Sequence, residues 1–226
     1  MLAARPAAAE ITLSQNFDNG WLNVAGSTVV GSTVNLEPRR FASSEWSGDQ
    51  WWVHFKANGE QSVTPQFNLN VSSAFQGNYG GIKFVYSYDQ TNCSFFDNGS
   101  RAGDTYSFSN NPAFTQDQVS VAYGLPCTAA MTDAHTAGVA ASPHVTPTTS
   151  GNASLVIGQT PGTAGGGYTD DLGRSVPVQN LYGYKITDAT ATGAKQKVVI
   201  TTGNHSGEPT GTHTLQGWLV TGEDNV

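Results

Sequence analysis

The chain has 226 residues, of which only 12% are charged, and a formal net charge of −7. Its ten Lys and Arg residues form no cluster that could neutralise a run of phosphates, so we expect no nucleic-acid partner. No stretch approaches the roughly 20 apolar residues that span a bilayer, so we expect no membrane partner. With 38% hydrophobic residues the chain can bury one large core or two modest ones, and we expect two domains.

Residues 1–14 are expected to be a tail or a signal remnant. Ala7–Ala9 are small, as in a signal cleavage region, but the segment lacks an apolar central region, so a clipped remnant and a disordered tail both fit. The weakly charged composition favours a secreted or periplasmic protein, with the cytoplasm as the alternative. Cys93 and Cys127 lack the close spacing of a structural zinc site and fit either a disulfide or two separate thiols.

Residues 15–124 show alternation of apolar and polar side chains, which is typical of strands with one buried face. Trp51, Val53 and Phe55 share one face of a predicted strand, and Trp52, His54 and Lys56 the other. Further strands are predicted in the ranges Gln66–Ser72, Ile82–Tyr88 and Val119–Tyr123. Short strands separated by Gly, Asn and Asp predict an antiparallel β-sandwich.

The pattern changes after Pro126, and residues 125–226 are expected to form a separate domain. Thr128–Ala141 predicts a helix with Thr128 or Thr132 near its start. Tyr182–Ile186 alternates, and we expect it to form a hairpin with the apolar run Val198–Ile200 in a buried sheet. Pro209 then opens a predicted helix with apolar residues at Leu215, Trp218 and Leu219.

A candidate metal site lies between that apolar run and the last helix. His205 and Glu208 offer an imidazole nitrogen and a carboxylate oxygen within four residues, and both can bind one zinc ion. Gly207 allows the segment to bend between them. In open α/β sheets ligands bind beyond the carboxyl ends of strands, which is where this tetrapeptide is expected.

The same segment resembles the zinc-binding segment of carboxypeptidase A-like metallocarboxypeptidases. The resemblance is carried by Lys197–Pro209, Gly211 and Gln216–Leu219, with weaker similarity in Asn16–Gly20, Trp51–Phe55, Phe84–Asp89, Val121–Pro126, Leu172–Val176 and Tyr182–Thr187. Of these ranges, the three that are similar to the β-sandwich of the cytosolic carboxypeptidase-like branch are Asn16–Gly20, Trp51–Phe55 and Phe84–Asp89. The resemblance implies a β plus α/β fold, in which an N-terminal antiparallel β-sandwich precedes the first part of a mixed-sheet α/β metallopeptidase domain.

By this resemblance His205 and Glu208 are the first two ligands of one zinc ion, and the substrate is the C-terminus of a peptide or protein. The family's third ligand, its general-base glutamate and its carboxylate-binding arginines lie further along than Val226. We therefore expect the 226 residues to be a fragment of a zinc carboxypeptidase, inactive alone. The oligomeric state is not predicted.

The other histidines have ordinary interpretations. His213 lies five residues after Glu208, about 140° around a helix, and is expected to point away from the metal as a half-exposed side chain. His54 is expected on the polar face of its strand. His135 and His144 are expected to be solvated.

A second function class stays open, in which the sandwich is a non-catalytic carbohydrate- or protein-binding module. Trp52 is expected on the surface, where it and Tyr79 fit either a sugar-stacking platform or ordinary sheet packing. Asp170 and Asp171 are interpreted as a turn. Arg174 fits a position in the cleft or, more simply, at a solvated strand edge.

Overall fold

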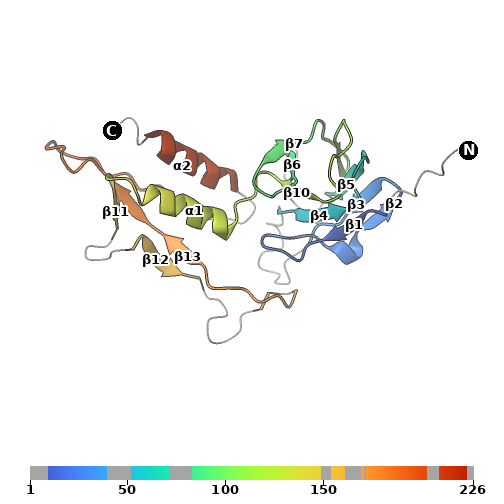
Figure 1. Ribbon diagram of the computed structural model, residues 1–226, viewed down its shortest axis with the longest axis horizontal. Coiled ribbons are helices and arrows are strands. Elements are labelled where there is room, and N and C mark those ends of the chain that lie inside the picture. Colours follow the sequence, from blue (N-terminus) through green and yellow to red (C-terminus); the bar gives the residue numbers. More distant parts are fainter. Residues whose placement is uncertain are drawn as a thin grey trace, which may run out of the picture. The chain divides into compact units, whose positions relative to one another are not determined.

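The structure is a computed structural model that describes residues 10–39, 52–71, 83–148, 154–160, 169–170, 172–202 and 209–222. The chain divides near Pro126 into two compact units (Figure 1). The expected β plus α/β architecture is confirmed. Neither helix of the described residues combines the length and apolarity needed to cross a membrane.

The first unit is a sandwich in which the described residues form two five-stranded sheets. One sheet is antiparallel throughout. In spatial order its strands are β1 (Thr12–Ser14), β4 (His54–Asn58), β10 (Val119–Tyr123), β6 (Phe84–Ser87) and β7 (Cys93–Phe95).

The other sheet contains a parallel pair, β3 with β5, among antiparallel neighbours. Its spatial order is β2 (Thr28–Val30), β3 (Thr33–Leu36), β5 (Gln66–Asn70), β9 (Thr105–Ser109) and β8 (Ser100–Ala102). A short 3₁₀ helix, η1 (Val24–Gly26), precedes β2, and the Asn23 side chain accepts a hydrogen bond from Gly26 N at its start.

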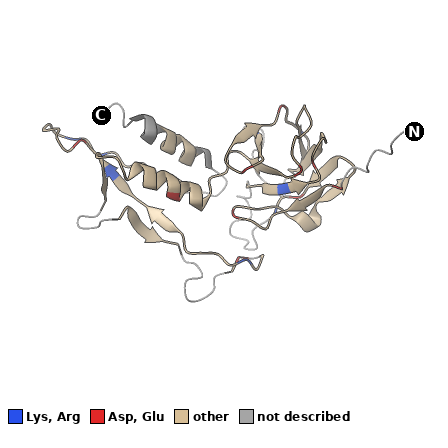
Figure 2. Ribbon diagram, viewed as in Figure 1, with Lys and Arg blue, Asp and Glu red and all other residues tan. Residues whose placement is uncertain are grey.

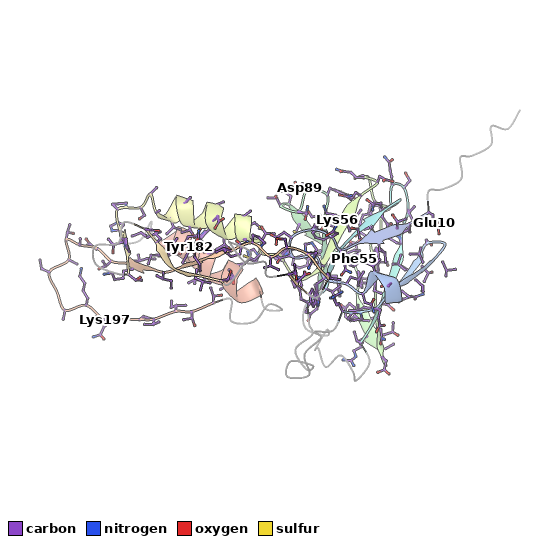
Figure 3. All side chains as sticks on the ribbon, turned by 90° about the horizontal axis from the view of Figure 1, so that it is seen from below. Glu10, Phe55, Lys56, Asp89, Tyr182 and Lys197 are labelled. Carbon is purple, nitrogen blue, oxygen red and sulfur yellow. The ribbon has the colours of Figure 1, made fainter. Side chains whose placement is uncertain are left out.

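Aromatic rings fill the core between the two sheets. Phe84 of β6 stacks on Phe108 of β9 with ring centroids 4.0 Å apart, and Phe55 of β4 meets Phe67 of β5 edge-on at 5.8 Å. Figure 3 shows Phe55 within the sandwich. Phe67 and Leu69 are buried while their neighbours in β5 are half-buried, as the alternation predicts. Offset and edge-on ring pairs add to the stabilisation that burial provides.

A second, smaller apolar cluster is formed by Trp52, Val85 and Ala122. Val85 and Ala122 alternate with core residues of β6 and β10, so these strands are buried on both faces. The expectation of one buried face therefore fails here. Trp52 and His54 are 9% and 1% exposed, so their expected positions on an exposed polar face are wrong. Burial of both faces follows from this extra packing, which alternation alone does not reveal.

The second unit begins with helix α1 (Ala129–Val139). Thr128 caps it as predicted, since its hydroxyl accepts a hydrogen bond from Met131 N at 3.1 Å. Two antiparallel ribbons follow, β11 (Val145–Pro147) with β14 (Tyr184–Ile186), and β12 (Val156–Gln159) with β13 (Asn180–Tyr182). The last element is helix α2 (Pro209–Gly222). Tyr182 links a ribbon to α1 by donating a hydrogen bond to Asp133 Oδ1 at 2.5 Å.

The predicted hairpin between Tyr182–Ile186 and Val198–Ile200 is wrong. Ile186 pairs with Val145 instead, and the apolar run forms no strand. Val198, Val199 and Ile200 are 79%, 88% and 52% exposed. Figure 3 shows Lys197, just before them, on an extended part of the chain. Strand residues need a hydrogen-bonding neighbour, and the described residues provide none along this run.

Packing in the second unit is sparse. Among its described residues, only Thr136 and Val139 are buried. Ile157 and Leu181, in β12 and β13, expose 59% and 48% of their surfaces. Because burial of apolar surface is the main stabilising contribution to folding, the described part of this unit contributes little stability compared with the sandwich.

Candidate metal site and its surroundings

His205 and Glu208 lie outside the described residues, and the structure describes their flanks. The described residues before the segment end at Thr202, and α2 begins with Pro209, immediately after Glu208 in sequence. The hydroxyl oxygens of Thr202 and Thr212 are 3.0 Å apart. This contact joins the two ends of the segment that contains the expected zinc ligands.

The predicted helix after Glu208 is confirmed, with proline at its first position. His213 is partly exposed on α2. His135 and His144 are also partly exposed. Within the described ranges no three His, Cys, Asp or Glu side chains gather in a group that could hold a metal ion.

Arg174 is engaged in a local turn. Its Nε lies 2.6 Å from Asp170 Oδ2, and the same carboxylate accepts hydrogen bonds from the backbone nitrogens of Leu172 and Arg174. Partial burial acts to raise the pKa of Asp170, but the hydrogen bonds from Arg174 and Leu172 outweigh it and hold the pKa below its usual value. The interpretation of Asp170 as a turn residue is confirmed, while Asp171 lies outside the described residues.

His54 has a structural environment in the sandwich. Its Nε2 lies 2.8 Å from Ser120 Oγ, and its ring meets Phe17 and Trp52 edge-on at 4.8 and 5.7 Å. Burial, together with the positive charge of Lys56, lowers the pKa of His54 to about 4, against a smaller opposing effect of the Asn19 backbone. His54 is therefore a neutral, packed imidazole near neutral pH, in contrast to the solvated residue expected.

Trp52 does not form the sugar-stacking platform that the sequence left open. Its ring is buried, and its Nε1 donates a hydrogen bond to the Asn19 carbonyl at 2.8 Å. Tyr79 lies outside the described residues. Cys93 and Cys127 do not form a disulfide.

The outer face of the sheet that contains β3 and β5 carries a row of polar side chains. Asn35 donates a hydrogen bond to Thr28 Oγ1 at 3.2 Å, and Asn68 donates one to Asn35 Oδ1 at 3.2 Å. Ser107 donates a third to Asn68 Oδ1 at 2.9 Å. Each pair stands directly opposite in the strand register. The row therefore continues across four neighbouring strands.

A polar groove of about 450 Å³ lies on the same face. Its lining comprises Gly26, Asn35, Leu36, Glu37, Asn68, Asn70, Asp104 and Thr105. Asn70 Nδ2 donates to Glu37 Oε2 at 2.8 Å, which fixes two of the lining groups. Asn68 and Asn70 alternate with the buried Phe67 and Leu69 of β5, so their side chains share the outer face. The parallel pairing of β5 with β3 then places Asn35 beside Asn68.

Charged residues are otherwise sparse along the described ribbon, where Figure 2 colours Lys and Arg blue and Asp and Glu red. One charged residue, Glu60, lies in the turn after β4. It is completely buried, and neither carboxylate oxygen has a hydrogen-bond partner. No local sequence pattern around Glu60 indicates this burial.

No protein-family profile and no curated protein sequence matches the chain. Solved structures do match. A metallo-carboxypeptidase from Burkholderia cenocepacia matches with a TM-score of 0.51 and 19% identity, over 61% of this chain and 35% of that one. The chain has a carboxypeptidase-like fold.

Two further bacterial structures give lower scores. A putative carboxypeptidase from Burkholderia mallei has a TM-score of 0.49 and 20% identity, over 61% of this chain and 35% of its own. A metallo-carboxypeptidase from Pseudomonas aeruginosa, solved with (2-guanidinoethylmercapto)succinic acid, has a TM-score of 0.48 and 19% identity, over 61% and 36%. The similarity thus spans about a third of each carboxypeptidase chain.

Proposed function

We propose that this chain belongs to a zinc-dependent carboxypeptidase that removes residues from the C-terminus of peptides or proteins. The observation that carries the proposal is the carboxypeptidase-like fold, matched by the Burkholderia cenocepacia metallo-carboxypeptidase. The sequence adds a His-x-x-Glu segment immediately before α2. Neither observation alone specifies a zinc enzyme, but together they favour one.

His205 and Glu208 are the proposed ligands within this chain. A neutral imidazole nitrogen and a carboxylate oxygen are both common zinc ligands. We expect the Glu208 carboxylate to be further stabilised by the N-terminal end of α2, because the peptide dipoles give that end partial positive charge. Zinc, when bound, supplies a Lewis acid that polarises a carbonyl group and lowers the pKa of bound water.

Two ligands are fewer than the three protein ligands of catalytic zinc sites. A third ligand would have to join His205 and Glu208, and the described residues hold no group that supplies a complete site. We therefore expect the 226-residue polypeptide to bind zinc weakly and to hydrolyse no blocked dipeptide.

Zinc binding to the full chain tests the two ligands. In competition with a chromophoric chelator, His205→Ala and Glu208→Gln should each weaken zinc binding by at least about tenfold, because each removes one of two ligands. His213→Ala, on the helix that follows, is the matched control and should leave binding unchanged. Zinc affinity that is the same in His205→Ala and in the unmodified chain would refute the assignment.

The polar groove supports a second candidate function, a carbohydrate-binding module. Carboxamide and carboxylate groups of Asn68, Asn70 and Glu37 line it, and such groups donate to and accept from sugar hydroxyls. Chemical-shift changes on titration with soluble oligosaccharides should centre on these residues. Asn68→Ala should remove the changes, whereas His213→Ala should not. Absence of any shift across neutral and acidic oligosaccharides would exclude this function.

A further inference from the structure

Glu60 is a fully buried carboxyl group at the turn that follows β4. Its side chain is 0% exposed, and both carboxylate oxygens lack a hydrogen-bond partner. An ionised carboxylate in such a position loses its hydration without replacement. The protonated form loses much less, so this environment favours a neutral Glu60.

The turn is attached to the segment just before β10 by several hydrogen bonds. Glu60 N donates to the Asp117 carbonyl at 3.0 Å, and Ser62 N donates to the Phe114 carbonyl at 2.8 Å. Phe114 N in turn donates to the Val63 carbonyl at 3.0 Å. The Phe114 ring is buried against Tyr86, with centroids 5.1 Å apart. The turn therefore fixes a residue of the core.

The backbone of the turn is held in an uncommon conformation. Ser62 has φ of 65°, in a region that residues other than glycine rarely adopt. Gly59 has φ of 86°, and a Cβ atom there would lie 2.7 Å from the Glu10 carbonyl oxygen. Contacts with neighbouring segments, rather than local preference, keep the turn closed.

The charged group that acts on Glu60 from the adjoining segment is Asp117, whose like charge also favours the neutral form. From the neighbouring elements, Glu10 presents its backbone carbonyl beside Gly59, and the Lys56 ammonium lies over the Phe17 ring at 4.8 Å. Burial first, and Asp117 second, raise the pKa of Glu60 to about 7.

We propose that the turn from Gly59 to Val63 is a proton-dependent latch on the segment 114–117. With Glu60 neutral, the turn stays closed and keeps Phe114 in the core. When Glu60 releases its proton to solvent, the carboxylate moves into water, the turn opens, and its hydrogen bonds with Phe114 and Asp117 break. The latch thus couples local order at this end of the sandwich to pH near neutrality.

Amide hydrogen exchange on the full chain tests the latch. After correction for intrinsic exchange rates, the Ser62, Val63 and Phe114 amides should lose about tenfold protection between about pH 6 and about pH 8.5, as expected when a carboxyl titrates near 7 closed and near 4.5 open. Amides of the β5–β9 ladder provide the reference. Equal protection at both pH values would overturn the proposal.

Two variants separate Glu60 from other causes. Glu60→Gln should remove the pH dependence. Asp117→Asn should reduce it, because Glu60 in the closed turn then ionises at lower pH, nearer to its value in the open turn. An undiminished loss of protection in a folded Glu60→Gln protein would overturn the latch. If that variant does not fold, infrared spectroscopy of the unmodified chain decides, since a protonated-carboxyl band must disappear over the same pH range as protection.

Discussion

The hydroxyl groups of Thr202 and Thr212 share a hydrogen bond, with 3.0 Å between their oxygens, across the ends of the segment that carries His205 and Glu208. Thr212 belongs to the first turn of α2, whereas Thr202 is the last described residue before the segment. Under the proposed zinc site, a contact between the two flanks of this segment would lower the entropy lost when the segment orders around a metal ion.

Removing this contact should weaken zinc binding without removing a ligand. Thr212→Val keeps the side-chain shape but loses the hydroxyl, and an exposed hydrogen bond of about 0.5–1 kcal/mol corresponds to a two- to fivefold loss of affinity. Thr201→Val, at an exposed neighbouring position, is the control and should have no effect. Equal zinc affinity of the Thr212 and Thr201 variants would show that the contact does not organise the segment.

Burial of His54 predicts acid lability. Its pKa is about 4 in the folded chain, against an ordinary value of 6.5, so between these values the unfolded state binds more protons. Stability should therefore fall as pH decreases from 6.5 to 4, by about 3 kcal/mol for a shift of this size. His54→Phe should lose this contribution to the pH dependence, as measured by urea unfolding at several pH values.

The titration of Glu60 should change stability in the opposite direction over nearly the same pH range. Its pKa of about 7 in the folded state means that the folded chain binds more protons than the unfolded chain between about 4.5 and 7. Stability from this group falls as pH rises, again by about 3 kcal/mol. The two effects should nearly cancel in the unmodified chain. Glu60→Gln should consequently show stability rising steeply from pH 4 to 6.5, and a flat profile would contradict the predicted cancellation.

Alanine substitutions at Gly59 and Gly103 distinguish the effect of a steric clash from that of backbone strain. Gly59→Ala places a Cβ atom 2.7 Å from the Glu10 carbonyl oxygen, at a φ of 86°. Gly103 has a φ of 58° but no atom within 4 Å of the corresponding position. Gly103→Ala should destabilise by about 1 kcal/mol, and Gly59→Ala by at least about 2 kcal/mol more. Thermal unfolding measures both effects. Equal effects would show that the backbone near Glu10 shifts easily to make room for the added Cβ atom.

Stability should reside in the sandwich. Phe108, fully buried and stacked on Phe84, should cost about 3–5 kcal/mol when changed to alanine. The same change at Leu181, which is 48% exposed in β13, should cost under about 1 kcal/mol.

Limited proteolysis should cleave within residues 127–202 first and leave a resistant first unit. A first unit that loses its near-ultraviolet dichroism on cleavage would show that both units share one core.

Local signals in the sequence predict much of the fold. Alternation at Phe67 and Leu69 identifies their buried face because the side chains of a strand alternate strictly. Thr128 marks the start of α1 because its hydroxyl satisfies a backbone donor that the helix cannot. Both depend on residues close together in sequence. The His-x-x-Glu site stays a prediction, since its residues lie outside the described ranges.

Other features depend on partners far along the chain. His54 is buried because Phe17, Trp52 and Ser120 cover it, and no alternation pattern shows such a covering. Val198–Ile200 has the composition of a strand but lacks a neighbour among the described residues. Strand formation there depends on pairing, which composition does not specify.

The strand order of the first sheet has a kinetic consequence. Its central pair joins Phe55 in β4 to Val121 in β10, and β1 joins β4 through Leu13 and Ala57. These partners lie about 65 and about 45 residues apart, so large loops must close before the ladders stabilise them, and folding should take roughly milliseconds to seconds. During synthesis the sheet cannot complete until β10 has left the ribosome, which leaves β4 and β6 without their shared neighbour and open to non-native pairing.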